Sequence, residues 1–333
     1  MNNNLDSLGV EKALTLFPEQ IKEAWKQAYA CDLPRIKPTG VLISGMGGSS
    51  NAAKILEGVY EEDFKVPVDI DIHNDYGLPS WVGKDSLFIA NSYSGNTEET
   101  LSGYEEAKIR GAKAIGISTG GKLNDVVIDA KSTNPTGFPK TGLGISIGAL
   151  AGVLAKLGVL HLTESEIFAA ADELIEIRKN WDAREMAEWL HGSLPVLFGG
   201  RPLIGALNAG RNAMCEISRN FTQFYDFPEM NHVLIEALQE PDLAKHNKYL
   251  FFVSNFNHER VKKRYEITKN ILIEMGLEHK TYELKGKTKL AQAFELPHYC
   301  AWVAYYLSML DGTDPGPEPW ITKLKESLSQ PVH

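Results

Sequence analysis

The chain has 333 residues, of which 43% are hydrophobic and 23% are charged, and its formal net charge is −9. Its length favours two domains, and its composition is that of an ordinary globular protein. The acidic balance, without a stripe of Lys and Arg, argues against nucleic-acid binding. No apolar run reaches the roughly 18 residues that a membrane-spanning helix needs, so we expect no membrane association.

The cysteines and the start of the chain indicate the compartment. Cys31, Cys215 and Cys300 are far apart and odd in number, which favours a reducing cytoplasm over a disulfide framework or a zinc site. The first ten residues, MNNNLDSLGV, lack the basic and then apolar pattern of a secretion signal. We therefore expect a cytoplasmic protein without a metal site.

The first half of the sequence alternates strand-like and helix-like segments. Apolar or alternating runs of strand length lie at residues 40–48, 66–74, 86–94 and 112–119, and helix-like segments lie at residues 50–60 and 97–111. This alternation predicts a mainly parallel sheet with helices on both faces.

The second half repeats the alternation after a helical tract at about residues 164–191. Strands are expected at residues 194–200, 248–255 and 278–284, and helices at residues 258–276 and 320–328, with one long helix or a pair of helices at residues 289–310. The segment 289–310 is apolar on more than one face, which fits either domain core or a subunit interface; its large aromatic residues are Phe294, Trp302, Tyr305 and Tyr306. The predicted fold class is α/β, with two three-layer αβα domains at residues 1–160 and 161–333.

Two loops that follow strands of the first half are rich in glycine and hydroxyl residues. They are residues 44–50, SGMGGSS, and residues 91–100, NSYSGNTEET. In parallel sheets, ligands lie beyond the carboxyl ends of the strands, where glycines allow close approach and helix N-termini offer free N–H groups. Neutral donors there predict a phosphate-monoester site. The same residues are also common in turns, and Thr97 also fits a simple helix N-cap.

Other kinds of phosphate site are disfavoured by the first loop. The run from Gly45 begins like the dinucleotide fingerprint G-x-G-x-x-G, but Ser50 stands where close helix–strand packing needs glycine. No Gly-Lys-Ser/Thr follows, as a Walker loop requires. An NAD or nucleotide-sugar enzyme is therefore the weakest alternative.

Three segments of the first half resemble the signature loops of the sugar isomerase (SIS) domain. They are GMGGSS at 45–50, NSYSGNTEET at 91–100 and STGGKL at 118–123. The resemblance implies that a phosphosugar is bound through its phosphate by the hydroxyls of Ser49, Ser92, Ser94 and Thr97. We expect Gly47 and Gly48 to bring the backbone close to the same ligand.

Two segments of the second half resemble bifunctional phosphoglucose/phosphomannose isomerases. CEISRNFTQFYDFPEMNH at 215–232 resembles that family's N-E-N-A-K … L-P-E-x-N-H, and DPGPEPWITKLKESL at 314–328 resembles its tail, D-P-T-P-V … I-x-x-L-K-x-x-L. The resemblance implies two SIS-type domains, no cofactor, and a homodimer whose active sites are shared between subunits.

The resemblance also implies an aldose–ketose isomerase that interconverts glucose 6-phosphate, and also mannose 6-phosphate, with fructose 6-phosphate through a cis-enediol. This reaction needs a base that moves a proton between C1 and C2, an acid/base pair that opens the sugar ring, and a cation that stabilises the enediolate. Glu216 matches the base, His232 the ring-opening histidine of the neighbouring subunit, and Lys325 the lysine at the ring oxygen, with Lys323 as the alternative in a shifted register.

Several positions depart from the family's pattern. Lys140 follows a proline where the family has an arginine that faces the enediolate; lysine keeps the charge but not the planar fork. Cys215 replaces an asparagine, Arg219 a lysine and Val233 an asparagine. Arg211 precedes the expected base by five residues, a shorter spacing than the family's arginine has.

These departures support an alternative of another class, a SIS-fold phosphosugar-binding or regulatory protein without turnover. The joint presence of Glu216, His232 and Lys325 favours the enzyme. A coupled assay of fructose 6-phosphate conversion to glucose 6-phosphate discriminates between the two.

Overall fold

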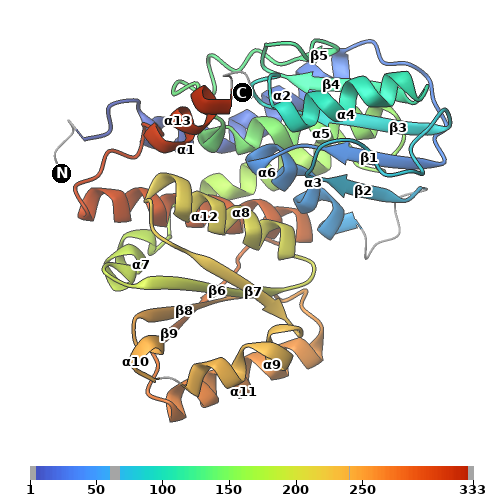
Figure 1. Cartoon of the computed structure of the whole chain (residues 1–333). Coiled ribbons are helices and arrows are strands. Elements are labelled where there is room, and N and C mark those ends of the chain that lie inside the picture. The colour runs from blue at the N-terminus through green and yellow to red at the C-terminus, as the bar shows by residue number, and fades with distance from the viewer. Residues whose placement is uncertain (1–4, 61–67, 240, 329–333) are drawn as a thin grey trace.

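Two sheets, stacked with helices between them, form the molecule (Figure 1). The computed structural model describes residues 5–60, 68–239 and 241–328. The first sheet has the strand order β2-β1-β3-β4-β5 and the second has the order β7-β6-β8-β9. The strand pairs within both sheets are parallel. The predicted α/β class with two mainly parallel sheets is confirmed.

The first sheet contains the strands expected from the apolar runs. They are β1 (Gly40–Ser44), β2 (Ile70–His73), β3 (Ser86–Asn91), β4 (Lys113–Ser118) and the short β5 (Val126–Val127). β1 and β3 are buried throughout because helices cover both faces of the sheet, which explains their continuous apolar sequences. β2 lies at the edge, and its side chains are partly exposed.

Helices cover both faces of this sheet. α2 (Phe17–Ala30), α3 (Gly47–Tyr60) and α5 (Leu143–Lys156) pack together on one face, and α4 (Glu98–Ile109) packs on β3 and β4. The sequence did not reveal α2, α5 or the short α1 (Val10–Thr15). In α5 the small residues serve close packing, because a Cβ at Gly148 would overlap the carbonyl of Ile21 on α2.

The second sheet repeats the order of the first. Its strands are β6 (Leu194–Gly200), β7 (Gln223–Phe227), β8 (Asn247–Val253) and β9 (His279–Glu283). In Figure 1, α8 (Ile204–Ile217) and α12 (Lys289–Leu310) lie on the face toward the first sheet, and α9 (Met230–Val233) and α11 (Glu259–Glu274) lie on the other face. Two short helical segments, η2 (Ile235–Gln239) and α10 (Pro241–Ala244), follow α9. The matching strand order supports the expected repetition of architecture.

One sequence prediction needs correction. The helical tract expected at 164–191 is two helices, α6 (Glu164–Arg178) and α7 (Ala183–Leu190). The break contains Asn180 and Asp182, which favour turns over helix interiors, and Asp182 accepts a hydrogen bond from the Tyr299 hydroxyl at 2.7 Å. α6 packs against both α2 and α12, so the division of the chain between residues 160 and 161 stays a proposal.

The long apolar segment 289–310 is a single helix and belongs to the core. In α12, Phe294, Trp302 and Tyr305 are buried and Tyr306 is partly buried, and the helix packs against α6, α7 and α8 within one chain. These aromatic side chains therefore carry no argument for a subunit interface. No helix in the described ranges has the length and apolar character of a membrane span.

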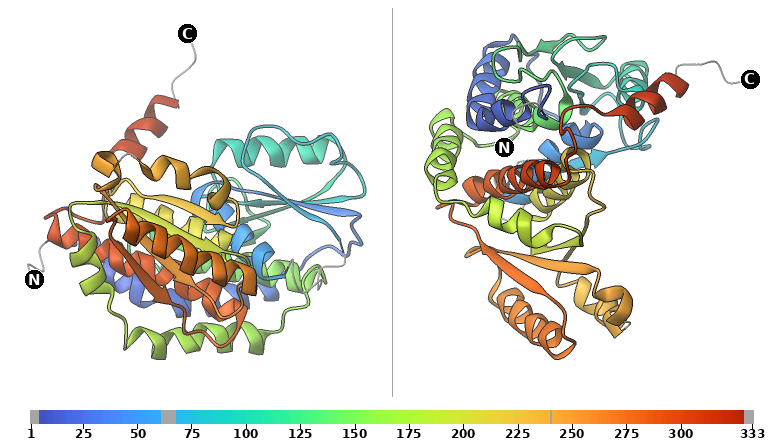
Figure 2. Two further views of the ribbon diagram at one scale, coloured as in Figure 1. Left: turned by 90° about the horizontal axis from the view of Figure 1, so that it is seen from below. Right: turned by 90° about the vertical axis from the view of Figure 1, so that its left-hand side faces the viewer.

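The last helix has a different environment. α13 (Pro319–Leu328) has no buried residue and projects from the body in both views of Figure 2. Its apolar side chains Trp320, Leu324 and Leu328 recur at intervals of four residues and are exposed by 76%, 59% and 58%. One face of α13 is therefore apolar and uncovered within the chain.

Candidate active site

The first hydroxyl-rich loop joins β1 to α3. Gly47 begins α3 with φ of +51°, a backbone conformation that favours glycine. The buried Ser49 accepts a hydrogen bond at its Oγ from the backbone N–H of Tyr93 at 3.1 Å. Its carbonyl accepts another from Asn91 Nδ2 at 3.0 Å. The Ser49 hydroxyl proton stays available for a ligand, because the contact with Tyr93 uses only an acceptor position of the oxygen.

The second loop places a pair of hydroxyls at the start of α4. Ser92 Oγ and Thr97 Oγ1 lie 2.7 Å apart. Thr97 does occupy the N-cap position, but its side chain makes no capping hydrogen bond. The first N–H groups of α4 therefore have no side-chain cap and can serve an anion. Ser94 is exposed, and its Oγ accepts a hydrogen bond from Asn96 N at 3.3 Å.

The third signature loop packs against the second. A Cβ at Gly95 would overlap the carbonyl of Gly120, and one at Gly121 would overlap the carbonyl of Ser94. The backbone N–H of Lys122 donates to Asn96 Oδ1 at 3.2 Å. The predicted phosphate loops thus form one contiguous surface at the carboxyl ends of β1, β3 and β4.

Packing of α8 along α3 brings Glu216 to this surface. A Cβ at Gly205 would overlap the carbonyl of Lys54, and further along α8, Asn208 bonds Asn51 at 2.8 Å. As α8 proceeds, its contacts move toward the start of α3. The last turn of α8 therefore lies beside the first phosphate loop, and Gly48, Lys140 and Glu216 line one narrow cavity of about 40 Å³.

The environment of Glu216 suits a base that works near neutral pH. Burial raises the pKa of its carboxyl to about 7, and the negative charge of Glu318 adds to this rise. Lys140, Arg211 and Lys325 act in the opposite direction and lower it. A carboxyl that titrates near the working pH can both accept and return a proton.

Lys140 lies on a short helical turn, η1 (Pro139–Thr141), next to the end of α8. Its Nζ donates to the carbonyl of Glu216 at 3.4 Å and lies 3.6 Å from Glu318 Oε1. Burial lowers the pKa of the Lys140 ammonium group, whereas the charges of Glu318 and Glu216 raise it.

The second phosphate loop supports this turn. Tyr93 OH accepts a hydrogen bond from Asn134 Nδ2 at 2.7 Å, and Asn134 Oδ1 accepts one from Thr141 Oγ1 at 2.9 Å. The position of Lys140 is therefore linked through Tyr93 to the loop that carries Ser92 and Thr97.

The two remaining sequence-predicted residues differ in their placement. Lys325 lies on α13. Its positive charge lowers the pKa of Glu216, so Lys325 lies on the same side of the molecule as Glu216. Lys323 lies 5.4 Å above the ring of Trp320, so the alternative register is less favoured. His232 is exposed on α9, on the face of the second sheet opposite α8 (Figure 1). One chain thus brings together the phosphate loops, Glu216, Lys140 and Lys325, but not His232.

Sequence reasoning missed Glu318, and it noted Arg219 only as a departure from the family's pattern without placing it at this site. Glu318 lies in the segment before α13 and pairs with Lys140, and Arg219 donates from Nη2 to the carbonyls of Asp314 and Pro317 at 3.0 and 3.1 Å. The sequence did contain a signal for Glu318. The family's tail has valine at this position, so the chain gains a negative charge here, and it also departs from the family at Lys140.

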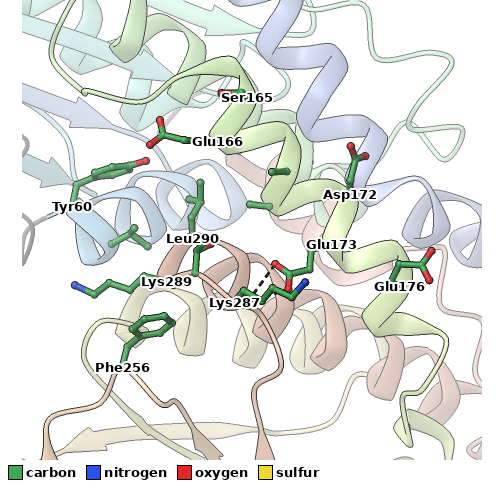
Figure 3. A pocket seen from close by; sticks show the side chains of 14 residues that line it. Tyr60, Ser165, Glu166, Asp172, Glu173, Glu176, Phe256, Lys287, Lys289 and Leu290 are labelled. Atoms are coloured by element: carbon green, nitrogen blue, oxygen red, sulfur yellow. Dashed lines mark hydrogen bonds between the residues drawn. The ribbon is translucent and has the colours of Figure 1, made fainter.

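A wider groove elsewhere is a poor phosphate site. It has a volume of about 890 Å³ and lies between α6 and the start of α12 (Figure 3). Carboxylates of α6 line it: Glu166, Asp172, Glu173 and Glu176. The backbone N–H of Lys287 already donates to Glu173 Oε1 at 3.1 Å. Lys287 and Lys289 also line the groove, but the four carboxylates outnumber them, and the net negative charge disfavours a phosphate. The narrower site at Glu216 is therefore the better candidate.

The fold and the site define a protein of the two-domain SIS class. Two mainly parallel sheets are flanked by helices, and glycine- and hydroxyl-rich loops lie beside the carboxyl of Glu216. Residues 179–328 match the family model described as the bacterial phospho-glucose isomerase C-terminal SIS domain. The tagatose-6-phosphate ketose/aldose isomerase of Escherichia coli has the same fold, with a TM-score of 0.67 at 14% identity over 95% of this chain and 98% of that one.

Curated relatives identify the family. The bifunctional phosphoglucose/phosphomannose isomerase of Caldicellulosiruptor bescii is 32% identical over 94% of this chain and 97% of its own length. The protein of the same name from Aquifex aeolicus is 34% identical over 87% of this chain and 91% of its own length. The chain therefore belongs to the bifunctional phosphoglucose/phosphomannose isomerase family, and the resemblance expected from its sequence is confirmed.

Proposed function

We propose that the chain is an aldose–ketose isomerase that interconverts glucose 6-phosphate with fructose 6-phosphate, with mannose 6-phosphate as a further substrate. The observation that carries this proposal is the placement of Glu216. Its carboxyl, with a pKa of about 7, lies at the start of α3 beside the phosphate loops. A sugar phosphate anchored in those loops would present its C1–C2 end to a base that is suitably poised.

The residues divide the reaction as follows. Ser49, Ser92, Ser94 and Thr97 bind the phosphate with their hydroxyls, and Gly47 and Gly48 allow its close approach. In the open-chain sugar, Glu216 removes a proton from one of C1 and C2 and returns it to the other. The C1 and C2 oxygens exchange roles through the cis-enediol, so the step transfers no electrons to or from a cofactor.

Lys140 supplies positive charge beside Glu216, where the developing enediolate would form. Ring opening is assigned to Lys325 of the same chain and to His232 of a neighbouring subunit. His232 is exposed, and it lies on α9, on the face of the second sheet opposite α8, which supports a role across an interface.

This division of roles implies a homodimer whose active sites are shared between subunits. We place this homodimer in the cytoplasm. The uncovered apolar face of α13 supports an interface near Lys325, because an isolated helix with such a face is stabilised by packing. Two copies that each cover the other's face would give the closed, two-fold arrangement usual for homo-oligomers.

A phosphosugar-binding protein without turnover is the less favoured alternative. The departure at Lys140 keeps a cation beside the base, and Cys215 directs its Sγ toward the carbonyl of Thr222 at 3.6 Å rather than into the Glu216 cavity. Neither departure removes the carboxyl of Glu216 or the cation beside it.

A coupled assay tests the function. Fructose 6-phosphate is supplied with glucose-6-phosphate dehydrogenase and NADP, and NADPH formation reports glucose 6-phosphate. Mannose 6-phosphate is tested in the same coupling with an excess of an auxiliary glucose-phosphate isomerase. We expect turnover in both arms. Binding of the sugar phosphates in calorimetry without turnover in either arm would support the non-catalytic alternative.

A further inference from the structure

Three departures of this chain from its family's pattern lie together in space. Lys140 stands for an arginine, Arg219 for a lysine, and Glu318 for the valine of the tail pattern D-P-T-P-V. They come from three distant parts of the sequence, yet each contacts the tail or belongs to it. Such a set of linked departures indicates a local rearrangement of charge around the base.

The central contact is the ion pair between Lys140 and Glu318. Lys140 Nζ lies 3.6 Å from Glu318 Oε1, and only 1% of the Lys140 side chain and 9% of the Glu318 side chain are exposed. A buried ammonium group without a counter-charge is unfavourable, so Glu318 stabilises the charged form of Lys140 in this place. If position 318 were valine, the negative charge near Lys140 would come from the carboxyl of Glu216.

Arg219 fixes the tail just before Glu318. Its backbone has φ of +56°, and its Nη2 donates to the carbonyls of both Asp314 and Pro317. Gly316, between them, donates from its N–H to Asp314 Oδ1 at 2.9 Å. Both hydrogen bonds come from Nη2, which carries two N–H groups and can donate one to each carbonyl. The segment of residues 314–317 is thus held in place, and it positions the carboxyl of Glu318 next to Lys140.

We propose that Glu318 is a positioning residue for the isomerase reaction, which holds the Lys140 ammonium group beside Glu216 and prevents it from forming a closed ion pair with the catalytic carboxylate. This inference rests on the proposed function. It adds a residue of the tail to the site and explains how a lysine serves where the family uses an arginine.

The charges that face Glu216 come from several elements. Lys140 comes from η1, Glu318 from the tail, Lys325 from α13 and Arg211 from α8 itself. His298 of α12 lines the same cavity, but burial lowers its pKa to about 3, so it is neutral in the working range. Arg219 acts on Lys140 and lowers its pKa. Without the charge of Glu318, three cations face Glu216 and the pKa of its carboxyl should fall.

A direct titration tests this. The protein is labelled with ¹³C at the glutamate carboxyl, Glu216→Gln assigns the Glu216 resonance, and its titration midpoint is compared in the wild type and in Glu318→Gln. We expect the midpoint to fall by about one pH unit in Glu318→Gln. Glu318→Asp keeps the charge and should stay closer to the wild type. Glu326→Gln, on exposed α13, is the matched control and should leave the midpoint unchanged.

Kinetics give the second readout. The acid limb of kcat/KM should move to lower pH with the titration midpoint, and kcat on the plateau should fall about three- to tenfold because the base is weaker. KM should stay within about twofold, since the phosphate loops are untouched. In a Lys140→Gln background the effect of Glu318→Gln should shrink, because the two residues act through one contact.

The outcomes separate the two proposals. An unchanged Glu216 midpoint in a folded Glu318→Gln protein overturns the inference, whatever the activity. Absence of turnover in the wild type overturns the proposed function, while the titration still decides the role of Glu318. If Glu318→Gln does not fold, Glu318→Val removes the same charge and carries the family's residue, and the same shift is expected.

Discussion

Asn208 of α8 donates a hydrogen bond from Nδ2 to Oδ1 of Asn51 on α3, at 2.8 Å. This bond joins a helix of the second sheet to the helix that begins at the first phosphate loop. Arg211 Nη2 also donates to Asn208 Oδ1, at 2.7 Å, and so holds the amide in its orientation. Glu216 follows Asn208 by about two helical turns. The register of α8 on α3 therefore decides whether Glu216, the proposed base, reaches a ligand at that loop.

Gly205→Ala tests this register. An alanine Cβ would overlap the carbonyl of Lys54, so α8 and α3 must move apart. We expect a loss of about 1–3 kcal/mol in the free energy of unfolding and a fall in kcat of about tenfold or more. Urea unfolding and steady-state kinetics measure both. Gly83→Ala is the control, because a Cβ there meets nothing within 4 Å. Equal behaviour of the two variants would show that this close approach is unimportant.

The double substitution Ser94→Ala and Thr97→Ala tests the phosphate site. Each hydroxyl that donates to a charged phosphate should contribute about 1.5–3 kcal/mol to binding, so affinity for glucose 6-phosphate should fall strongly while the fold persists. Calorimetry measures the affinity, and circular dichroism checks the fold. Ser102→Ala, on the helix α4 that follows this loop, is the matched control. Unchanged affinity in the double variant would place the phosphate elsewhere.

The raised pKa of Glu216 predicts a particular dependence of stability on pH. The folded value of about 7 exceeds the ordinary 4.5, so between these values the native state binds more protons than the unfolded state. The contribution of this group therefore falls as pH rises through that window, because a charge must then be buried. Glu216→Gln removes the effect. It should be more stable than the wild type by on the order of 3 kcal/mol at pH 8 and nearly equal to it at pH 4. Equal differences at both pH values would contradict the assignment.

Much of the fold followed from the sequence, and the reasons are local. β1, β3, β6 and β8 are apolar runs buried on both faces, and Gly276, with φ of +69°, ends α11 as expected. The helices α5 and α8 were missed because close contact with other helices, through Gly148 and Gly205, shapes their sequences. α2 was missed although its buried side chains form one apolar stripe.

The sequence offered candidates for the loops and the base of the proposed site but not for its charge pairs. Short motifs made Ser92, Thr97 and Glu216 candidates, because each lies in a short stretch that resembles a family pattern. Lys140 and Glu318 are distant in the sequence, and their contact depends on how the tail returns to the end of α8. Only the folded chain shows that contact.

Mixing two inactive variants tests whether sites are shared. Glu216→Gln lacks the base and His232→Ala lacks the ring-opening histidine. In a mixed dimer with shared sites, one site carries both changes and the other carries neither. Random exchange at equal amounts makes about half of the dimers mixed, so activity should recover to about a quarter of the wild type. Demonstrated subunit exchange without recovery would show that His232 acts in its own chain or has no catalytic part.

The central claim is that Glu216 moves a proton between C1 and C2 of a sugar phosphate. Its most direct test is the reaction of fructose 6-phosphate in D₂O, followed by proton NMR. The wild type should produce glucose 6-phosphate with deuterium at C2, because the base exchanges its proton with solvent at the enediol stage. Glu216→Gln should still bind the sugar phosphate in calorimetry but lose well over 10²-fold in this turnover. Deuterium incorporation at the wild-type rate in Glu216→Gln, or no conversion by the wild type, would contradict the account.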